Sequence, residues 1–561
     1  MKKIALAIVG ILLAFSFVFF KQPAKQPVKD TRPNIVVILA DDLGFSDIGC
    51  YGSEIHTPNI DYLAAHGIRY TRFYNTSRCC PTRASLLTGL YNQRAGIGNM
   101  TDTEDEPGYL GHLAENSVTL AEVLKGAGYH TAMSGKWHVS NTVGQKDPEE
   151  QQKWLNHQVY YPTFSPLAQY PTSRGFEKFF GTIWGVVDYY DPFSLVSGTT
   201  PVKTVPKNYY HTDAINDTAA SYIKEFSRDK PFFLYVAENA PHWPLMAPPE
   251  DIARYKDTYK VGWDTIRARR YNKLVKAGII DAAKAPLSLR DKASLKWEDN
   301  PNKDWDAAAM AVHAAMIDRM DQGVGRIIKA LKESGKLDNT LIVFLSDNGA
   351  SSENCTAYGP GFDRPNQTRA GEKIAYDMKK TILPGLETSY ASIGERWANV
   401  ANTPYRYWKA ESYEGGVHTP MIAFWPKGVT VANGSLSNQL GHVKDFMATF
   451  VEVAKTIYPL TYKGHPVMPK QGKSFAASFK GITNADEALF NEHYGARYVR
   501  YNGWKMVSLS NDTTWNLYHI KDDETEINDQ AAKYPEKVSQ LSAMWHQWAT
   551  ANNVYPKPRH K

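Results

Sequence analysis

Reactive side chains are concentrated between positions 77 and 89, in the stretch Ser-Arg-Cys-Cys-Pro-Thr-Arg-Ala-Ser-Leu-Leu-Thr-Gly. Pro81 suits the first turn of a helix, where its missing N–H costs nothing, and Gly89 can end that helix. The pattern therefore predicts a short helix with Cys79 and Arg83 near its N-terminus, where unpaired N–H groups attract anions. A nucleophile beside a guanidinium fork suits a tetrahedral oxyanion ester. Two buried cysteines beside a chance Pro and Arg are the alternative that this stretch alone leaves open.

Two adjacent carboxylates, Asp41 and Asp42, follow the continuous apolar run 34–40. Such a run is typical of a buried central strand, and ligands of open α/β sheets bind at the carboxyl ends of strands. Adjacent acids repel each other unless a cation or a loop amide compensates for them. A solvated acid beside a helix-capping acid is the alternative at this point.

A second buried strand of the same kind, residues 340–346, ends in Asp347 and Asn348. The helical pattern of residues 308–335 leads into it. Two strands that end in oxygen ligands can surround one divalent cation. An all-oxygen set favours calcium or magnesium over zinc.

Four further polar side chains follow predicted strand ends or precede one. Lys136 and His138 follow the run that starts at Thr131, His242 follows the strand 231–237, and Lys409 precedes the strand 421–425. A lone Lys or His at one such place is more often a surface or core residue. Four of them at strand ends point to a shared anion pocket.

The motif Cys79-x-Pro81-x-Arg83, followed by Leu-Leu-Thr-Gly, resembles the signature of the formylglycine-dependent sulfatases of the alkaline phosphatase-like superfamily. Residues 240–245 and 402–406 are most similar to the bacterial arylsulfatase branch. In the family a formylglycine-generating enzyme oxidises the cysteine to 3-oxoalanine (formylglycine), whose hydrate attacks sulfur. Thr82 stands where the family usually has Ser or Ala. His418 stands where many sulfatases have Arg.

The resemblance implies a role for each candidate residue. One calcium, or alternatively magnesium, is held by Asp41, Asp42, Asp347, Asn348 and residue 79. Sulfate is bound by Lys136, His242 and Lys409, and the developing charge is neutralised by Arg83, Lys136, Lys409 and the metal. His242 is the expected general acid toward the leaving alcohol, and His138 the expected base that orients the hydrate and collapses the sulfated intermediate.

Composition limits the class of protein. The chain has 561 residues, of which 43% are hydrophobic and 22% charged, so it is globular and too long for one core of ordinary size. A net charge of +6 and the absence of helix-turn-helix, zinc-finger or basic-helix patterns argue against a nucleic-acid partner. The four cysteines, Cys50, Cys79, Cys80 and Cys355, are too few for a disulfide framework and fit no zinc spacing.

The N-terminal segment, residues 1–30, has the architecture of a signal peptide. A basic start, Met1-Lys2-Lys3, precedes the mostly apolar run 4–20 and a spacer rich in Pro and Lys, residues 21–30. The expected location is therefore periplasmic or secreted. Because the apolar run is long and lacks a clear small-x-small cleavage site, a membrane anchor at residues 4–20 is the alternative.

The expected fold is α/β, with a large central, mostly parallel sheet flanked by helices. We predict a catalytic domain at residues 31–457 and a C-terminal subdomain at residues 458–561. The latter should contain four short strands, with Asn502-Gly503 as a hairpin turn, and a final helix at 535–549.

The predicted activity is hydrolysis of sulfate monoesters, with an aryl sulfate or a sulfated saccharide as substrate. A phosphate or phosphonate monoester hydrolase is the rival enzyme, because related folds and the same motif serve that chemistry. An inactive, anchored glycan-binding homologue is the rival from another class.

Overall fold

The computed structural model describes residues 30–104, 106–226, 229–290 and 294–554. The predicted signal or anchor at residues 1–30 lies almost wholly outside the described residues. The described residues from Arg32 onward form one compact unit. Among the residues that the structure describes, no helix is both long enough and apolar enough to cross a membrane.

A large mixed sheet forms the centre of this unit, as predicted. Its middle strands β8, β1, β7, β3 and β4 are mutually parallel, and β9 runs antiparallel between β8 and β2. In spatial order the strands are β10 (Ser435–Ser437), β2 (Ile68–Tyr74), β9 (His418–Phe424), β8 (Thr340–Ser346), β1 (Asn34–Ala40), β7 (Phe232–Ala237), β3 (His130–Gly135), β4 (Lys178–Thr182), β5 (Leu195–Ser197) and β6 (Thr200–Pro201), with β11 (Gly441–His442) also paired to β2.

The register of β1 against β8 brings the two predicted ligand pairs together. Leu39 pairs with Leu345 and Ala40 with Ser346, so both strands end at the same level. Asp41 and Asp347 each follow immediately. Since parallel neighbours end at the same edge of a sheet, two segments about 300 residues apart in the chain meet there.

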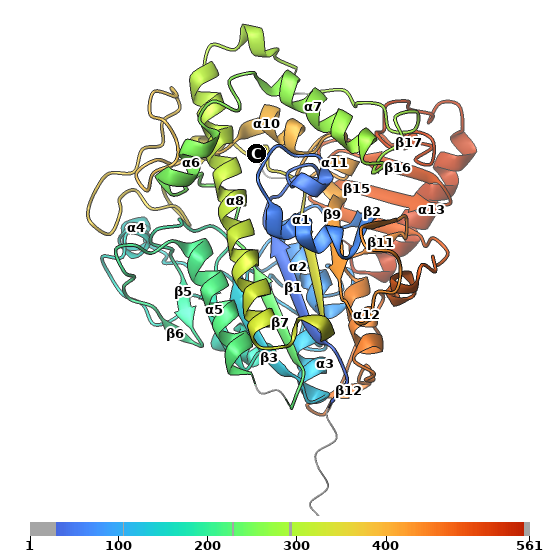
Figure 1. Cartoon of the computed structure of the whole chain (residues 1–561), viewed down its shortest axis with the longest axis horizontal. Helices are drawn as coiled ribbons and strands as arrows, with labels where there is room; N and C mark the ends of the chain where they lie inside the picture. The colour runs from blue at the N-terminus through green and yellow to red at the C-terminus, as the bar shows by residue number, and fades with distance from the viewer. Residues whose placement is uncertain (1–29, 105, 227–228, 291–293, 555–561) are drawn as a thin grey trace, which may run out of the picture. The chain divides into compact units, whose positions relative to one another are not determined.

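Alternate residues of β1 serve two different cores. Val36 and Ile38 pack into the core beneath one set of helices, and Ile35 and Val37 into the core of the other. Each such buried aliphatic side chain contributes about 1.5–3 kcal/mol. The first set is α1 (Pro58–Ala65), α5 (His211–Glu225), α6 (Pro249–Tyr255) and α8 (Lys303–Glu333), and the second is α2 (Cys79–Thr88), α3 (Leu120–Gly126) and α12 (Asp445–Val453). Figure 1 shows α5 and α8 side by side in front of the sheet.

The helix α2 forms where the Cys-x-Pro-x-Arg motif predicts it. Arg78 is its N-cap in extended conformation, and Gly89 ends it with a left-handed φ of 71°. Every residue of the helix is buried. The Thr82 hydroxyl oxygen lies 3.0 Å from the Thr76 amide nitrogen and accepts its hydrogen bond, which fixes the entry into the helix.

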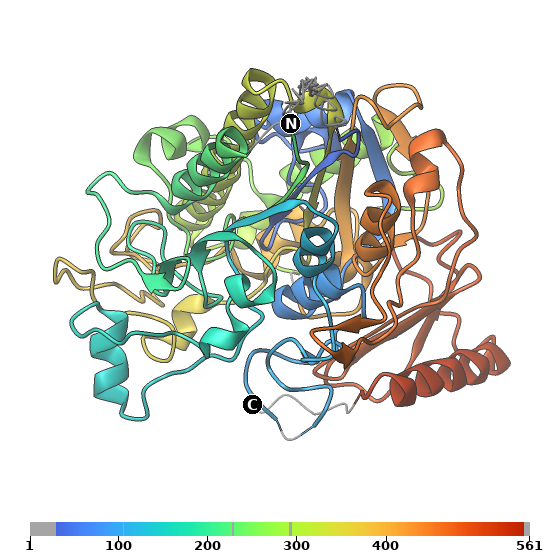
Figure 2. The same ribbon diagram turned by 90° about the horizontal axis from the view of Figure 1, so that it is seen from below.

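The predicted C-terminal antiparallel sheet is present. It contains β14 (Leu489–His493), β15 (Ala496–Tyr501), β16 (Trp504–Ser508) and β17 (Asn516–Tyr518) in that order, and α13 (Pro535–Ala551) packs on it. Figure 2 shows α13 in red along this sheet. The domain boundary at 457/458 stays a prediction.

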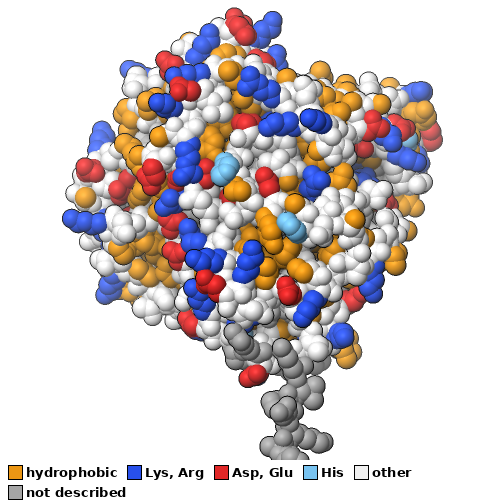
Figure 3. Space-filling view, viewed as in Figure 1, with side chains coloured by type: hydrophobic (Ala, Val, Ile, Leu, Met, Phe, Trp, Pro, Cys, Tyr) orange, Lys and Arg blue, Asp and Glu red, His pale blue; other side chains and the backbone are white. Residues whose placement is uncertain are grey.

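The remaining elements lie in the long connections. The stretch 145–169 contains α4 (Pro148–Leu155), and residues 458–471 contain a small hairpin, β12 (Thr461–Tyr462) and β13 (His465–Pro466). The others are α7 (Trp263–Lys276), α9 (Cys355–Tyr358), α10 (Gly394–Ala401) and α11 (Glu414–Val417). On the face drawn in Figure 3, acidic and basic side chains are interspersed, in keeping with the modest net charge.

Candidate active site

Four oxygen-bearing side chains meet at the carboxyl ends of β1 and β8, as the sequence predicts. The amide nitrogen of Asn348 lies 2.6 Å from Asp42 Oδ1, and the Asp42 backbone N–H donates to Asp347 Oδ1 over 3.2 Å. Asp42 adopts a left-handed φ of 65°, which is strained for a residue other than glycine. Asp41 and Asp347 are fully buried. The turn after β1 therefore places both of its acids in this cluster.

The cluster fits a hard divalent cation. Among the described residues, Asp41 Oδ1 and Asn348 Oδ1 are buried and have no hydrogen-bond partner. Burial, and then repulsion by Asp41, raise the pKa of Asp347 well above its usual value. Unpartnered buried oxygens and mutually repelling carboxylates are both relieved by a cation with oxygen ligands.

Two buried cations balance part of this negative charge. Lys136 Nζ lies 2.5 Å from Asp41 Oδ2, and Arg83 donates to Asp347 Oδ2 over 2.8 Å. Arg83 also donates to the Lys136 carbonyl, which ties α2 to the end of β3. Although burial alone raises the pKa of Asp41, Lys136, His242 and Arg83 together lower it to about 2. The Asp41 carboxylate is therefore ionised.

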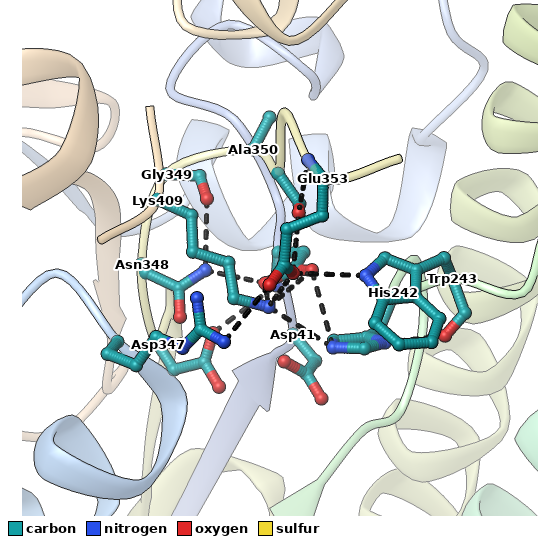
Figure 4. Close-up of polar contacts among 12 residues, drawn as sticks. Asp41, His242, Trp243, Asp347, Asn348, Gly349, Ala350, Glu353 and Lys409 are labelled. Carbon is teal, nitrogen blue, oxygen red and sulfur yellow. Dashed lines mark hydrogen bonds and ion pairs between the residues drawn. The ribbon is translucent and has the colours of Figure 1, made fainter. Parts of the chain in front are cut away.

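His242 and Lys409 form a second pair, shown in Figure 4. Lys409 Nζ lies 2.9 Å from Asp42 and 3.2 Å from His242 Nε2. His242 Nδ1 lies 2.5 Å from the Trp243 carbonyl oxygen. Since a carbonyl accepts and an ammonium donates, we assign the imidazole proton to Nδ1 and acceptance from Lys409 to Nε2. Burial lowers the pKa of His242, in keeping with a neutral ring.

Cys79, Cys80 and His138 bring their ligand atoms within 4.8 Å of one another. The structure places the His138 ring against the second cysteine as well, with Nε2 3.4 Å from Cys80 Sγ. Burial lowers the pKa of His138 to about 4, so this ring is neutral at neutral pH. A hydrogen bond from Cys80, followed by the charge of Lys136 and a hydrogen bond with His138, brings the pKa of the Cys79 thiol well below its usual value despite burial.

The position of His138 depends on a glycine in a different segment. A Cβ added to Gly185 would lie 2.1 Å from His138 Cε1, closer than any real contact. His138 itself has a left-handed φ of 52°. The ring therefore occupies a slot that only a glycine at position 185 leaves open.

These side chains open onto a cavity of about 300 Å³. Its wall includes Cys79, His138, His242 and Lys409. Arg83 and Lys136 do not belong to the described residues that line the cavity. Both of these cations are fully buried. In this structure both cations contact carboxylates of the cluster, and the binding of sulfate by Lys136 stays a prediction. The wall also carries Arg78, Met100, Thr101, Asp102, Thr142, Trp184, Gly185, Val186, Trp243, Glu353, Tyr358, Phe362, Asp363 and Arg364.

Several residues of the site are not apparent from the sequence. Glu353 contacts Lys409, Trp243 and Arg78, and no periodic pattern marks a single carboxylate in a long loop. A charged residue shortly after the Asp-Asn-Gly turn is the one signal that points to it. His418, in contrast, lies outside this cavity, where its ring contacts Glu414 at 3.0 Å.

Comparison with known proteins is consistent with this geometry. A family model described as Sulfatase matches residues 33–456. An uncharacterized sulfatase of Schizosaccharomyces pombe is 30% identical over 95% of this chain and 96% of its own. An arylsulfatase of Klebsiella aerogenes is 34% identical over 80% of this chain and 92% of its own.

Two solved structures share the fold. One, a protein in complex with its substrate D-glucosamine-2-N,6-O-disulfate, has a TM-score of 0.59 at 21% identity, over 94% of this chain and 100% of that chain. The other, a phosphonate monoester hydrolase of Agrobacterium radiobacter, has a TM-score of 0.52 at 18% identity, over 91% and 96%. The family match spans most of the chain and includes every candidate site residue described above. The chain therefore belongs to the sulfatase family of sulfuric ester hydrolases.

Proposed function

We propose that this enzyme hydrolyses sulfate monoesters at residue 79 after oxidation of Cys79 to formylglycine by a maturation enzyme. The observation that carries the proposal is the position of Cys79. It lies in the first turn of α2 and lines the same cavity as His138, His242 and Lys409. A formylglycine hydrate supplies an oxygen nucleophile and a second hydroxyl that can expel sulfate, so water need not attack sulfur.

A divalent cation completes the site in this proposal. Asp41, Asp42, Asp347 and Asn348 would hold it, together with residue 79. Because all four side chains offer oxygen, calcium is the proposed ion, with magnesium as the alternative. Such a cation supplies positive charge that stabilises the negative charge developing on the ester.

The chain's own residues handle the anion and the protons. The Lys409 ammonium contacts both Asp42 and His242, so it can bind an ester oxygen. Despite burial, Asp42 and Glu353 raise the pKa of Lys409, so the ammonium keeps its proton. His242 is the proposed general acid, and its Nε2 takes up a proton from solvent in the cavity before it donates to the leaving alcohol. His138 is neutral and lies beside residue 79, so it is suited to accept a proton from the hydrate.

The proposed substrate is a sulfated saccharide or an aryl sulfate. Aromatic side chains at the cavity wall, including Trp184, Trp243 and Tyr358, can pack against a sugar or aryl ring. The similar arylsulfatase and the fold shared with a protein that binds a glucosamine disulfate support both substrate classes. The basic start and apolar run of residues 1–20 support a periplasmic or secreted enzyme, held at the membrane only if that segment stays uncleaved.

The two neighbouring cysteines provide the test. Peptide mass analysis of active enzyme should show an aldehyde or its hydrate at position 79 and an unmodified thiol at position 80. Cys79→Ala should fold and bind metal but have essentially no turnover, whereas Cys80→Ser should keep turnover. An active preparation with both thiols intact would rule out formylglycine and leave an ordinary thiolate as nucleophile.

The cation has its own test. Chelation should abolish activity, and calcium should restore it better than zinc. Stoichiometric zinc without calcium or magnesium in active protein would contradict the assignment.

The rival reaction is hydrolysis of phosphate or phosphonate monoesters. The observation that favours it is the fold shared with the Agrobacterium phosphonate monoester hydrolase. Side-by-side kcat/KM values for 4-nitrophenyl sulfate and 4-nitrophenyl phosphate separate the two enzymes. Binding of sulfated sugars without turnover by matured protein would favour the inactive, glycan-binding alternative.

A further inference from the structure

A carboxylate that the proposed mechanism does not use stands at the wall of the active-site cavity. Glu353 Oε2 lies 3.2 Å from Lys409 Nζ and accepts from Trp243 Nε1 over 3.1 Å. Its other oxygen, Oε1, accepts from Arg78 over 3.0 Å, and the Ser351 hydroxyl donates to Oε2 over 3.0 Å. In Figure 4 the Glu353 side chain reaches toward the Lys409 ammonium, next to His242 and Trp243. Both oxygens are therefore engaged in fixed contacts.

This carboxylate carries its charge in the folded enzyme. The Glu353 side chain is only 17% exposed. Burial alone would neutralise it, but Arg78, Lys409 and His242 hold its pKa well below the usual value. The ammonium of Lys409 consequently faces two carboxylates, Asp42 on the metal side and Glu353 on the cavity side.

The charge of the ester distinguishes the two rival reactions. A sulfate monoester carries one negative charge at every accessible pH. A phosphate monoester carries nearly two above neutrality, since its second pKa is about 6. An ester oxygen bound by Lys409 comes close to Glu353, because both contact the same ammonium. Repulsion by Glu353 thus acts roughly twice as strongly on a doubly charged ester as on a singly charged one.

We propose that Glu353 is a specificity-determining residue, a charge filter that favours singly charged esters over doubly charged ones at the Lys409 subsite. The inference rests on the proposed function only in that the ester binds beside residue 79 and Lys409. In this reading Glu353 excludes phosphate monoesters but admits sulfate monoesters and singly charged phosphonate monoesters alike.

Glu353→Gln tests the filter, because glutamine keeps the size and an acceptor oxygen but removes the charge. Three substrates with the same leaving group should be compared at about pH 8, where the phosphate monoester is doubly charged. They are 4-nitrophenyl sulfate (one charge), 4-nitrophenyl phenylphosphonate (one charge) and 4-nitrophenyl phosphate (two charges). The ratio of kcat/KM for phosphate to that for sulfate should rise roughly tenfold to a hundredfold. The phosphonate-to-sulfate ratio should stay within about threefold, because those two charges are equal.

Two variants serve as controls. Glu353→Asp keeps the charge and should keep the discrimination. Ser351→Ala removes a neutral contact of Glu353, so it should not raise the phosphate-to-sulfate ratio. Thermal unfolding of each variant verifies that it is folded.

The outcomes are separable. An equal loss on all three substrates in Glu353→Gln would overturn the filter and make Glu353 a positioning residue for Lys409. A rise in both the phosphate and phosphonate ratios would overturn it too, because charge would not be the cause. If the wild-type enzyme prefers phosphate to sulfate, the proposed function fails on that measurement alone. The response of the Glu353→Gln ratio still decides the filter.

Discussion

The imidazole of His242 lies between a carbonyl oxygen and an ammonium, and this pairing decides what the ring can do. Its Nδ1 faces the Trp243 carbonyl and its Nε2 faces Lys409. A neutral ring so oriented keeps one tautomer, with its proton on Nδ1 and with Nε2 accepting from the ammonium. The role of general acid proposed for His242 therefore requires that Nε2 is protonated before the alcohol leaves.

This pairing predicts that the effect of His242→Ala depends on the leaving group. Loss of a general acid typically lowers the rate about 10²–10⁴-fold. The loss should be large for sugar sulfates, whose alcohols need a proton, and small for 4-nitrophenyl sulfate, whose phenolate leaves unaided. Steady-state kinetics on both substrates measure the difference. Equal losses on both would assign His242 to sulfate binding instead.

A substitution at Gly185 tests whether activity depends on the position of the His138 ring. Alanine at this position forces the His138 ring out of its slot, since the new Cβ would lie 2.1 Å from Cε1. A displacement of about 1 Å at a catalytic group lowers the rate by roughly a hundredfold, so Gly185→Ala should lower kcat to that extent and leave the unfolding temperature nearly unchanged. Gly126→Ala is the matched control, because a Cβ there meets nothing within 4 Å. Full activity of Gly185→Ala would mean that His138 is not needed where the structure places it.

Individual residues could be predicted where a motif or a strand end marks them. Asp41 and Asn348 follow apolar runs, and the runs themselves predict the strands. Glu353 and Gly185 carry no such mark, because their roles arise from contacts with side chains more than a hundred residues away or in another loop. The contact of Cys80 with His138 is likewise a property of the folded helix and not of the spacing.

At the scale of elements, buried parallel strands were the most predictable part of the chain. β1 and β8 form where continuous apolar runs predict them, because both faces of the sheet are covered by helices. α4 has no clear apolar pattern in the sequence, since most of its residues are polar and only Gln151, Trp154 and Leu155 are buried. β9 begins three residues before the predicted start and includes His418.

Glu238, directly after β7, makes the stability of the enzyme depend on pH. Burial raises the pKa of this carboxyl to about 8, and its one side-chain partner among the described residues is the Asn216 amide, at 2.8 Å. The folded state thus favours the protonated form. Its contribution to stability is complete below the unfolded pKa of about 4.5 and is lost as the pH rises through about 8.

The corresponding prediction concerns Glu238→Gln, a neutral analogue of the protonated side chain. Wild-type enzyme should lose about 2–5 kcal/mol of unfolding free energy from this group between pH 5 and pH 9, and the variant should not. Denaturant unfolding of both proteins at the two pH values measures this difference. Parallel declines in the two proteins would show that Glu238 titrates normally.

At the scale of the whole molecule, a buried ion network joins the C-terminal sheet to the large sheet. Lys505 of β16 lies 2.7 Å from Glu414, in α11, and 2.8 Å from Glu526, in the loop after β17. Glu414 also contacts His418 at the start of β9. All of these side chains are buried. The network therefore reaches the segment that carries Lys409 without lining the active-site cavity.

Removal of the central cation should destabilise the protein strongly. Lys505→Met leaves two carboxylates buried without their partner, which typically costs about 3–5 kcal/mol. Lys521→Met, an exposed lysine of the same C-terminal part, is the control and should change stability by less than about 0.5 kcal/mol. Thermal unfolding with activity followed in parallel measures both. A Lys505→Met midpoint equal to that of the control would show that the network contributes no net stability.

The burial of Cys79 constrains when the proposed oxidation of this residue can occur relative to folding. The residue is 2% exposed, and it lies in a helix whose every residue is buried. A small reagent can enter the cavity, but the active site of another enzyme cannot close around a residue held this way. The maturation proposed above must therefore precede folding, while residues 77–89 are still an extended chain. Strand β8, which encloses the site with Asp347 and Asn348, is synthesised about 260 residues later. The proposed oxidation of Cys79 can therefore take place during synthesis, before the chain folds and buries this residue.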